Sequence, residues 1–133
     1  MKLSREYTLR CRLGARASAL LWHTASRFSS SIAVIYRGVR ADAKDSMRLL
    51  MIGPIANGDA TPPLAEGSSD QERRRWVDSM EPQSGHAITI EADGPDAEEA
   101  MKRLTLLFDR NFDFPAEPPK PYPVHAAREN PGN

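Results

Sequence analysis

Polar and apolar residues alternate over residues 7–13, in the stretch YTLRCRL. A period of two is typical of a strand with one buried face. The apolar positions are Tyr7, Leu9, Cys11 and Leu13. We therefore interpret Cys11 as a core residue and not as a reactive thiol, because the pattern fixes no basic group beside it.

Two segments that follow predict helices. Residues 16–28 repeat apolar side chains at helical spacing, which indicates an amphipathic helix. The apolar positions of this helix are Leu21, Trp22, Ala25 and Phe28. A second, short helix is predicted after the N-cap Asp45 and up to Ile52, because Gly53 and Pro54 follow as stop signals.

Two stretches predict the remaining strands. SSSIAVIYRGVRADA, at residues 29–43, contains a β-branched run, a turn at Arg37-Gly38 and a short second run, which together predict a hairpin. HAITIEA, at residues 86–92, has strand character and is bounded by glycines. The chain therefore contains strands that connect by short turns, as antiparallel strands do.

A last helix is predicted to start near Pro95 or Asp96, where Asp96 and Glu99 have the spacing of a capping box. The apolar face of this helix consists of Ala97, Ala100, Met101, Leu104, Leu107 and Phe108. The resulting order is β-α-β-β-α-β-α. This order predicts an α+β fold, a two-layer open-faced sandwich in which three helices cover one face of a four-stranded antiparallel sheet.

Two segments fall outside this domain, which spans residues 1–112. Residues 54–84 form an insert that is long for a connection inside a compact domain, and a short helix is predicted within it at 71–80. The candidate caps of that helix are Ser68, Ser69 and Asp70. Residues 113–133 are rich in proline, which removes backbone donors, so a disordered or polyproline-like tail is predicted.

Composition limits the classes of function. The formal net charge is +0, so no overall field favours nucleic acid, and the run Arg73–Arg75 has the acidic neighbours Glu72 and Asp78. One cysteine and three histidines without ligand spacing predict no metal and no cofactor. No apolar run has the length of a signal peptide or a membrane span, so we expect no membrane contact and a cytoplasmic protein.

The strand order together with the stretches RLGARASALLWHTASRF and YRGVRADAKDSMRLLMIG resembles HPr, the histidine-containing phosphocarrier protein family of the bacterial sugar phosphotransferase system. The similarity covers residues 4–53 and 85–110. It leaves the insert and the tail unmatched. The resemblance implies the same open-faced sandwich and phosphotransferase-system proteins as the class of partner.

The resemblance also implies that the first helix opens at the family's phosphate site, where a histidine accepts and passes on a phosphoryl group. Gly14 stands at that histidine's position, so no catalytic residue is assigned and the protein is not expected to be an enzyme. Ala15, Arg16 and Ala17 keep the backbone donors and the guanidinium that bind an anion. An equally weighted interpretation treats Arg16 as a solvated helix-start residue.

A regulatory serine of many family members corresponds to Asp45 in the ungapped alignment, with Ser46 following. Asp45 carries a permanent negative charge where the family gains one by phosphorylation. Its role as an ordinary helix cap is the favoured interpretation. Ser46 remains a possible kinase target in a different orientation.

The resemblance implies a partner surface on the first two helices, made in this chain of Leu20, Met47, Leu50 and Met51. Exposed apolar side chains that cluster in this way usually mark a contact. One hypothesis is that Trp76 and Met80 of the insert fold onto Leu50 and Met51. The alternative hypothesis is that the surface binds another protein.

The function predicted from the sequence is therefore a non-catalytic regulatory or protein-binding module related to the phosphotransferase system. An alternative is a stand-alone interaction scaffold unrelated to sugar phosphotransfer. A third candidate is a phosphocarrier that uses another residue, such as His23. For His23, His86 and His125 alike, an exposed position without a role is the favoured interpretation. The PxxP spacing in the tail, at Pro118 and Pro121, is interpreted as part of a solubilising extension and less readily as a binding motif.

Overall fold

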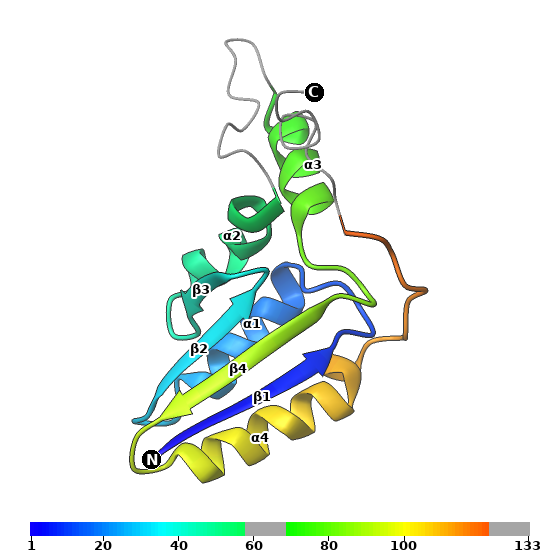
Figure 1. The fold of residues 1–133 in the computed structure, drawn as a ribbon. Coiled ribbons are helices and arrows are strands. Elements are labelled where there is room, and N and C mark those ends of the chain that lie inside the picture. Colours follow the sequence, from blue (N-terminus) through cyan, green and yellow to red (C-terminus); the bar gives the residue numbers. More distant parts are fainter. Residues whose placement is uncertain (58–68, 123–133) are drawn as a thin grey trace, which may run out of the picture.

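The computed structural model describes residues 1–57 and 69–122. Figure 1 shows one sheet with helices packed on it. The strands are β1 (Lys2–Thr8), β2 (Ser31–Tyr36), β3 (Val39–Asp42) and β4 (Ala87–Asp93). The helices are α1 (Ala15–Ala25), α2 (Ser46–Asn57), α3 (Asp70–Met80) and α4 (Ala97–Asp109), and a short 3-10 turn follows at Asn111–Asp113.

The sheet has the order β1-β4-β2-β3, and each neighbouring pair is antiparallel. α1 contacts both α2 and α4, and these three helices cover one face (Figure 1). Ile88 and Ile90 of β4 are buried beneath them. On the open face, the Glu91 carboxylate pairs with Arg40 at 2.6 Å and with Lys2 at 3.8 Å. The predicted α+β open-faced sandwich is confirmed.

The first strand lies earlier in the chain than predicted. β1 ends at Thr8, which pairs with Ala87, the first residue of β4. Beyond it, the Leu9 N–H donates to the His86 carbonyl at 2.8 Å and the Leu9 carbonyl accepts from the Gly85 N–H at 2.7 Å. The prediction of a strand over 7–13 is therefore wrong for residues 9–13. The alternation in burial continues without a strand, and Cys11 is 2% exposed, so its assignment to the core is confirmed.

The predicted hairpin is confirmed between β2 and β3. Its turn consists of Arg37 and Gly38, which have φ angles of 50° and 83°. Two successive residues with positive φ are the signature of the turn type that matches the twist of a hairpin. The first helix is confirmed as well, although it ends at Ala25 and leaves Phe28 in the following turn.

The second helix does not stop where the sequence predicts. α2 continues through Gly53 and Pro54 to Asn57. A Cβ atom at Gly53 would lie 2.3 Å from the carbonyl oxygen of Met80 and 2.5 Å from the Cα of Glu81. Gly53 is therefore required by the close approach of the chain at the end of α3, and it is not a helix stop signal.

Two predicted helix starts have different outcomes. The short helix in the insert is confirmed as α3, where Ser69 Oγ accepts from the Glu72 N–H at 3.1 Å and Glu72 Oε1 accepts from the Ser69 N–H at 3.3 Å. The capping box predicted for Asp96 and Glu99 is wrong. The Asp96 carboxylate instead accepts from the backbone and side chain of Ser30, which hold its pKa at about 2.

Part of the proline-rich tail, residues 115–122, lies against the domain without helix or strand. The disordered alternative predicted over 113–133 is therefore wrong for these residues, and the polyproline-like alternative stays a prediction. The Glu117 N–H donates to the Arg10 carbonyl, and the Lys120 N–H donates to the Ser84 carbonyl, both at 2.8 Å. Tyr122 accepts the Ala87 N–H at 2.8 Å. Residues 123–133 lie outside the described residues.

We predict that Gly53→Ala destabilises the protein. At an ordinary helix position this change stabilises by about 1 kcal/mol, because alanine has the higher helix propensity. Here the added methyl group meets main-chain atoms of Met80 and Glu81, so we expect a loss of about 1–3 kcal/mol of unfolding free energy. Urea denaturation measures the change, and an increase in stability would contradict the packing described here.

Candidate functional site

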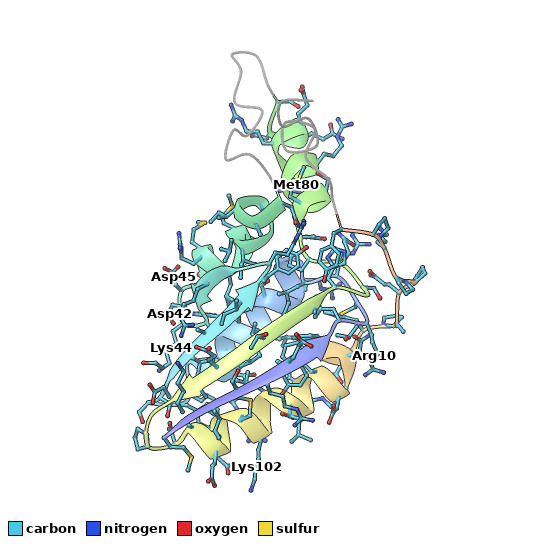
Figure 2. The ribbon with its side chains drawn as sticks, viewed as in Figure 1. Arg10, Asp42, Lys44, Asp45, Met80 and Lys102 are labelled. Carbon is cyan, nitrogen blue, oxygen red and sulfur yellow. The ribbon has the colours of Figure 1, made fainter. Side chains whose placement is uncertain are left out.

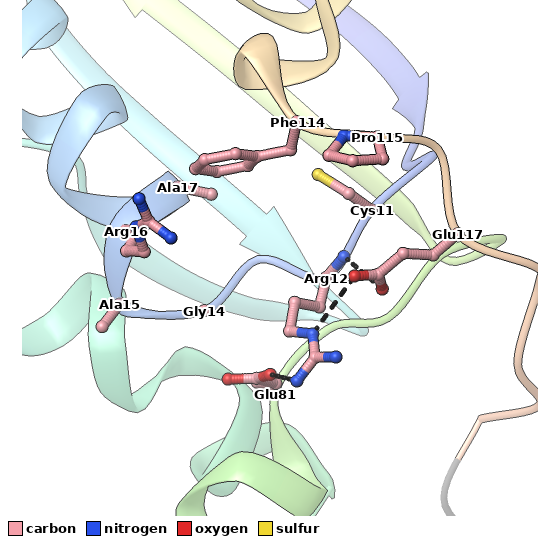
Figure 3. A pocket seen from close by; sticks show the side chains of 10 residues that line it. All are labelled: Cys11, Arg12, Gly14, Ala15, Arg16, Ala17, Glu81, Phe114, Pro115 and Glu117. Carbon is pink, nitrogen blue, oxygen red and sulfur yellow. Dashed lines mark hydrogen bonds and ion pairs between the residues drawn. The ribbon is translucent and has the colours of Figure 1, made fainter.

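A pocket of about 450 Å³ lies at the N-terminal end of α1 (Figure 3). Its floor is apolar and includes Cys11, Ala17 and Phe114, and its rim carries charged side chains. The charged residues that line it are Arg12, Arg16, Glu81 and Glu117. The pocket therefore combines the start of a helix with two arginines and two carboxylates.

Gly14 is the N-cap of α1 and lies in the wall of this pocket. Its φ of −89° and ψ of −161° are extended values that other residues also adopt. A Cβ at Gly14 would lie 3.0 Å from Glu81 Oε2 and 3.4 Å from both Glu81 Cδ and Oε1. A carboxylate from the end of the insert therefore occupies the space beside the first residue of the helix.

Arg12 connects the two carboxylates of the pocket. Its Nη1 lies 3.9 Å from Glu81 Oε1, and its Nε donates to Glu117 Oε2 at 3.3 Å (Figure 3). The backbone N–H of Arg12 also donates to Glu117 Oε1 at 3.2 Å. The Glu81 side chain is only 6% exposed, whereas that of Glu117 is 28% exposed. Arg12 thus neutralises a buried carboxylate and holds the tail against the same site.

The residues predicted to bind an anion line the pocket together. Ala15, Arg16 and Ala17 form the first turn of α1, and the Arg16 guanidinium lies over the Phe114 ring at 5.4 Å. The sequence pattern did not identify Glu81 or Glu117 as part of this site. Glu81 follows a helix of the insert and Glu117 lies in a proline-rich tail, so no local pattern connects either residue to α1.

Asp45 caps α2, as predicted. Its Oδ1 accepts from the Arg48 N–H at 3.1 Å, and its carbonyl accepts from the Leu49 N–H at 3.0 Å. Asp45 is exposed at the start of the helix (Figure 2), and Ser46 is the exposed first residue of α2. The negative charge of Asp45 is therefore accessible at a helix N-terminus, where it is favourable.

The four residues predicted for a partner surface differ in exposure. Leu20 of α1 is 37% exposed and Met47 of α2 is 65% exposed, while Leu50 and Met51 are half-buried. Ile55, in the last turn of α2, is also exposed, although no sequence pattern marked it. Of the four predicted residues, the two that are exposed lie on α1 and in the first turn of α2.

The insert contacts α2 at the opposite end from Met47. Met80 lies at the base of α3 (Figure 2), and its carbonyl accepts from Asn57 Nδ2 at 2.7 Å. The hypothesis that Trp76 folds onto Leu50 and Met51 lies outside the described residues, because the placement of that side chain is not described. Met80 meets α2 at Gly53 and Asn57, and its packing onto Leu50 and Met51 stays a prediction.

Burial keeps the thiol in the pocket protonated. Desolvation and the nearby Glu117 carboxylate raise the pKa of Cys11, and its Sγ lies 3.9 Å from the Asn111 carbonyl. A thiol nucleophile requires the thiolate, which a raised pKa disfavours at neutral pH. Cys11 is therefore part of the apolar floor of the pocket.

His86 is fully buried, so the prediction that it is exposed is wrong; it belongs to a hydrogen-bonded cluster just before β4. Its Nδ1 accepts from the Gln83 N–H at 3.1 Å and lies 2.8 Å from the Tyr36 hydroxyl. Because Nδ1 accepts this N–H, the proton of the neutral ring is on Nε2, which donates to the Lys120 carbonyl at 3.0 Å. Burial lowers the pKa of His86, so the imidazole is neutral and structural.

His23 differs from His86 in its surroundings. It lies in the last turn of α1 and is exposed, with its ring packed edge-on against Trp22. The C-terminal end of a helix is unfavourable for a phosphate, because the helix dipole is negative there. His125 lies outside the described residues.

Neither a metal site nor a membrane-spanning helix is present in the parts of the chain that the structure describes, residues 1–57 and 69–122. Within these ranges, no three histidine, cysteine, aspartate or glutamate side chains come together as a metal site. No helix in the same part of the chain is long and apolar enough to cross a membrane.

Comparisons with known proteins identify relatives. A family model described as the phosphorylation site of the PTS HPr component matches residues 3–73. The phosphocarrier protein HPr of Cupriavidus necator is 32% identical over 112 residues, which are 83% of this chain and 94% of that protein.

Two solved structures are similar over almost their whole length. HPr-C-His from Thermoanaerobacter tengcongensis has a TM-score of 0.55 and 25% identity, covering 86% of this chain and 98% of that one. The histidine-containing phosphocarrier protein of Mycoplasma has a TM-score of 0.54 and 25% identity, covering 84% of this chain and 96% of that one.

We predict that the protein loses stability as the pH falls below about 6.5, because the folded state lowers the pKa of His86 from 6.5. The unfolded chain then binds more protons than the folded one, so the free energy of unfolding decreases toward lower pH. The folded state also lowers the pKa values of Glu91 and Asp96 from their ordinary values of 4.5 and 3.8. These two shifts change the unfolding free energy only at more acidic pH, so they do not affect this range. Denaturation between about pH 7.5 and about pH 5.5 therefore measures the contribution of His86.

NMR titration of the His86 ring provides the direct measurement. The Tyr122 ring stacks on His86 at 4.0 Å between centroids. Tyr122→Ala removes that cover and is expected to move the pKa of His86 up toward 6.5. A titration midpoint at or above 6.5 in the unmodified protein would contradict the prediction.

Proposed function

We propose that this chain, which belongs to the HPr family of phosphocarrier proteins, acts as a non-phosphorylatable regulatory module that binds proteins of the phosphotransferase system. The observation that carries this proposal is Gly14. It is the N-cap of α1, the position at which the family resemblance places the phosphorylatable histidine. Glycine has no nucleophile, so phosphate transfer through this position is impossible.

The neighbouring groups support a non-catalytic role. The Cys11 thiol in the same pocket is buried and its pKa is raised, so it is a poor nucleophile. His86 is buried within hydrogen bonds, and His23 lies at the far end of α1. Transfer through His23 is therefore the third candidate, and only its exposure supports it.

The partner surface is proposed on α1 and the first turn of α2. Leu20 and Met47 expose large apolar side chains on two helices that pack together. Asp45, at the start of the same α2 turn, adds a fixed negative charge in place of a regulatory phosphate. A partner that recognises this surface would bind without any phosphorylation cycle.

A stand-alone interaction scaffold is the alternative function. It uses the same exposed residues for a partner outside the phosphotransferase system, since a fold can be retained while its function changes. Binding to the general phosphotransferase enzyme distinguishes the two candidates.

We predict no phosphorylation and measurable binding when the protein is mixed with phosphoenolpyruvate and a general phosphotransferase enzyme from a bacterium. Intact mass measured under alkaline conditions reports a phosphohistidine, and calorimetry reports binding. A mass gain of one phosphate that is lost in acid would refute the proposal and favour a histidine such as His23. No gain and no binding would favour the stand-alone scaffold.

We predict that Met47→Lys weakens this binding by about tenfold or more, because a central apolar contact typically contributes more than about 1.4 kcal/mol. Leu106→Lys is the matched control, since Leu106 is 50% exposed but lies on α4, outside the proposed surface. Equal weakening by both variants would show that the effect is not specific to the surface on α1 and α2.

A further inference from the structure

We infer that Glu81 is an intramolecular occupant of the space at the α1 N-terminus, and that any side chain at residue 14, a histidine included, would have to displace its carboxylate. The inference deepens the proposed function and rests on it for the identity of the site. It assigns a role to the insert, which delivers this carboxylate. The observation behind it is the position of Glu81 beside Gly14 in the pocket at the start of α1 (Figure 3).

This crowding follows from the position that the Cβ of residue 14 would take beside the Glu81 side chain. The backbone fixes the position of Cβ, so every residue other than glycine would place that atom 3.0 Å from Glu81 Oε2 and 3.4 Å from Glu81 Cδ. Optimal separations between nonbonded carbon atoms are about 3.5–4.0 Å. The backbone angles of Gly14 are compatible with alanine, so this contact is the obstacle and not the conformation.

The Glu81 side chain is buried, and the Glu81 backbone is held by contacts on both sides. The side chain is 6% exposed and lies 3.9 Å from Arg12 Nη1. The Glu81 carbonyl accepts from Gln83 Nε2 at 3.3 Å. The backbone of Glu81 also packs closely against Gly53. A Cβ added at Gly53 would lie only 2.5 Å from the Cα of Glu81.

Hydrogen bonds of the residues before and after Glu81 also hold the main chain of residues 80–82 in place. The Met80 carbonyl accepts from Asn57 Nδ2 at 2.7 Å, and the Pro82 carbonyl accepts from the Leu13 N–H at 2.8 Å. The second of these bonds joins the segment to the residue before Gly14. The insert and the start of α1 are therefore held in one arrangement, with the carboxylate between them.

The electrostatics favour the same arrangement. The N-terminus of a helix carries partial positive charge, and a carboxylate placed there is stabilised. Glu81 thus places a carboxylate group at the end of α1, where the family resemblance places a transient phosphate. Gly14 and the insert therefore depend on each other, because the Glu81 carboxylate of the insert lies in the space that the glycine leaves open.

The test is a double-mutant cycle on the stability of the full chain. Gly14→Ala is expected to lower the Tm by about 3–6 °C in the unmodified protein, because the new methyl group meets the carboxylate. In the background of Glu81→Ala the same change is expected to cause no loss, or a small gain from reduced freedom of the unfolded chain. Glu81→Asp, which shortens the side chain, provides a second background if Glu81→Ala does not fold.

Glu117→Ala is the matched control background. Glu117 lines the same pocket and pairs with the same arginine, but it makes no close contact with a Cβ at residue 14. Gly14→Ala is expected to lower the Tm as much in this background as in the unmodified protein. Glu81→Gln should behave in the same way, because it keeps the volume and removes only the charge.

Two results would overturn the inference. One is a loss of Tm on Gly14→Ala that is equal in the Glu81→Ala and Glu117→Ala backgrounds. The other is no loss at all in the unmodified protein. Both results are measured on the isolated chain, so they do not depend on whether a phosphotransferase protein binds. The double-mutant cycle can therefore be interpreted even if the proposed function fails.

Discussion

The functional end of the molecule depends on the close approach of the chain after α3 to α2 at Gly53. A side chain at residue 53 would overlap the main chain of Met80 and Glu81, so only glycine permits the contact. The contact determines where the Glu81 carboxylate lies, and the carboxylate determines what space remains beside Gly14. Gly14 and Gly53, which are far apart in sequence, thus both make room for the chain around Glu81. Through this packing the insert, which has no counterpart in the family pattern, reaches the start of α1.

A buried polar cluster joins the same region to the tail. Asn57 at the end of α2 donates to the Tyr36 hydroxyl, which contacts His86, and His86 in turn bonds the carbonyl of Lys120. Buried polar groups are stable only when their hydrogen bonds are satisfied, so each member requires the others. The cluster explains why a proline-rich segment follows the surface of the domain as far as Tyr122 when its composition indicates disorder.

The site combines features that differ in how easily they can be predicted. The helix start at Gly14 and the cap at Asp45 are encoded within a few residues, and both are found where the pattern places them. Glu81 and Glu117 reach the same pocket from the insert and the tail, and neither has a local signal. The chemistry of the pocket therefore has a part that the sequence predicts and a part that it does not.

The sequence by itself determined the fold class, the order of the elements and the hairpin turn at Arg37-Gly38, because periodicity and turn residues act locally. It also places a glycine, which has no nucleophile, at residue 14, where the family resemblance expects a histidine. The tertiary structure decided the extent of α2 and the partners of Asp96. It also decided the environment of Glu81. At Gly53 the local sequence predicts the end of a helix, but α2 continues and the chain at the end of α3 packs against this glycine. Packing between distant segments is stronger than the conformational preference of a single residue.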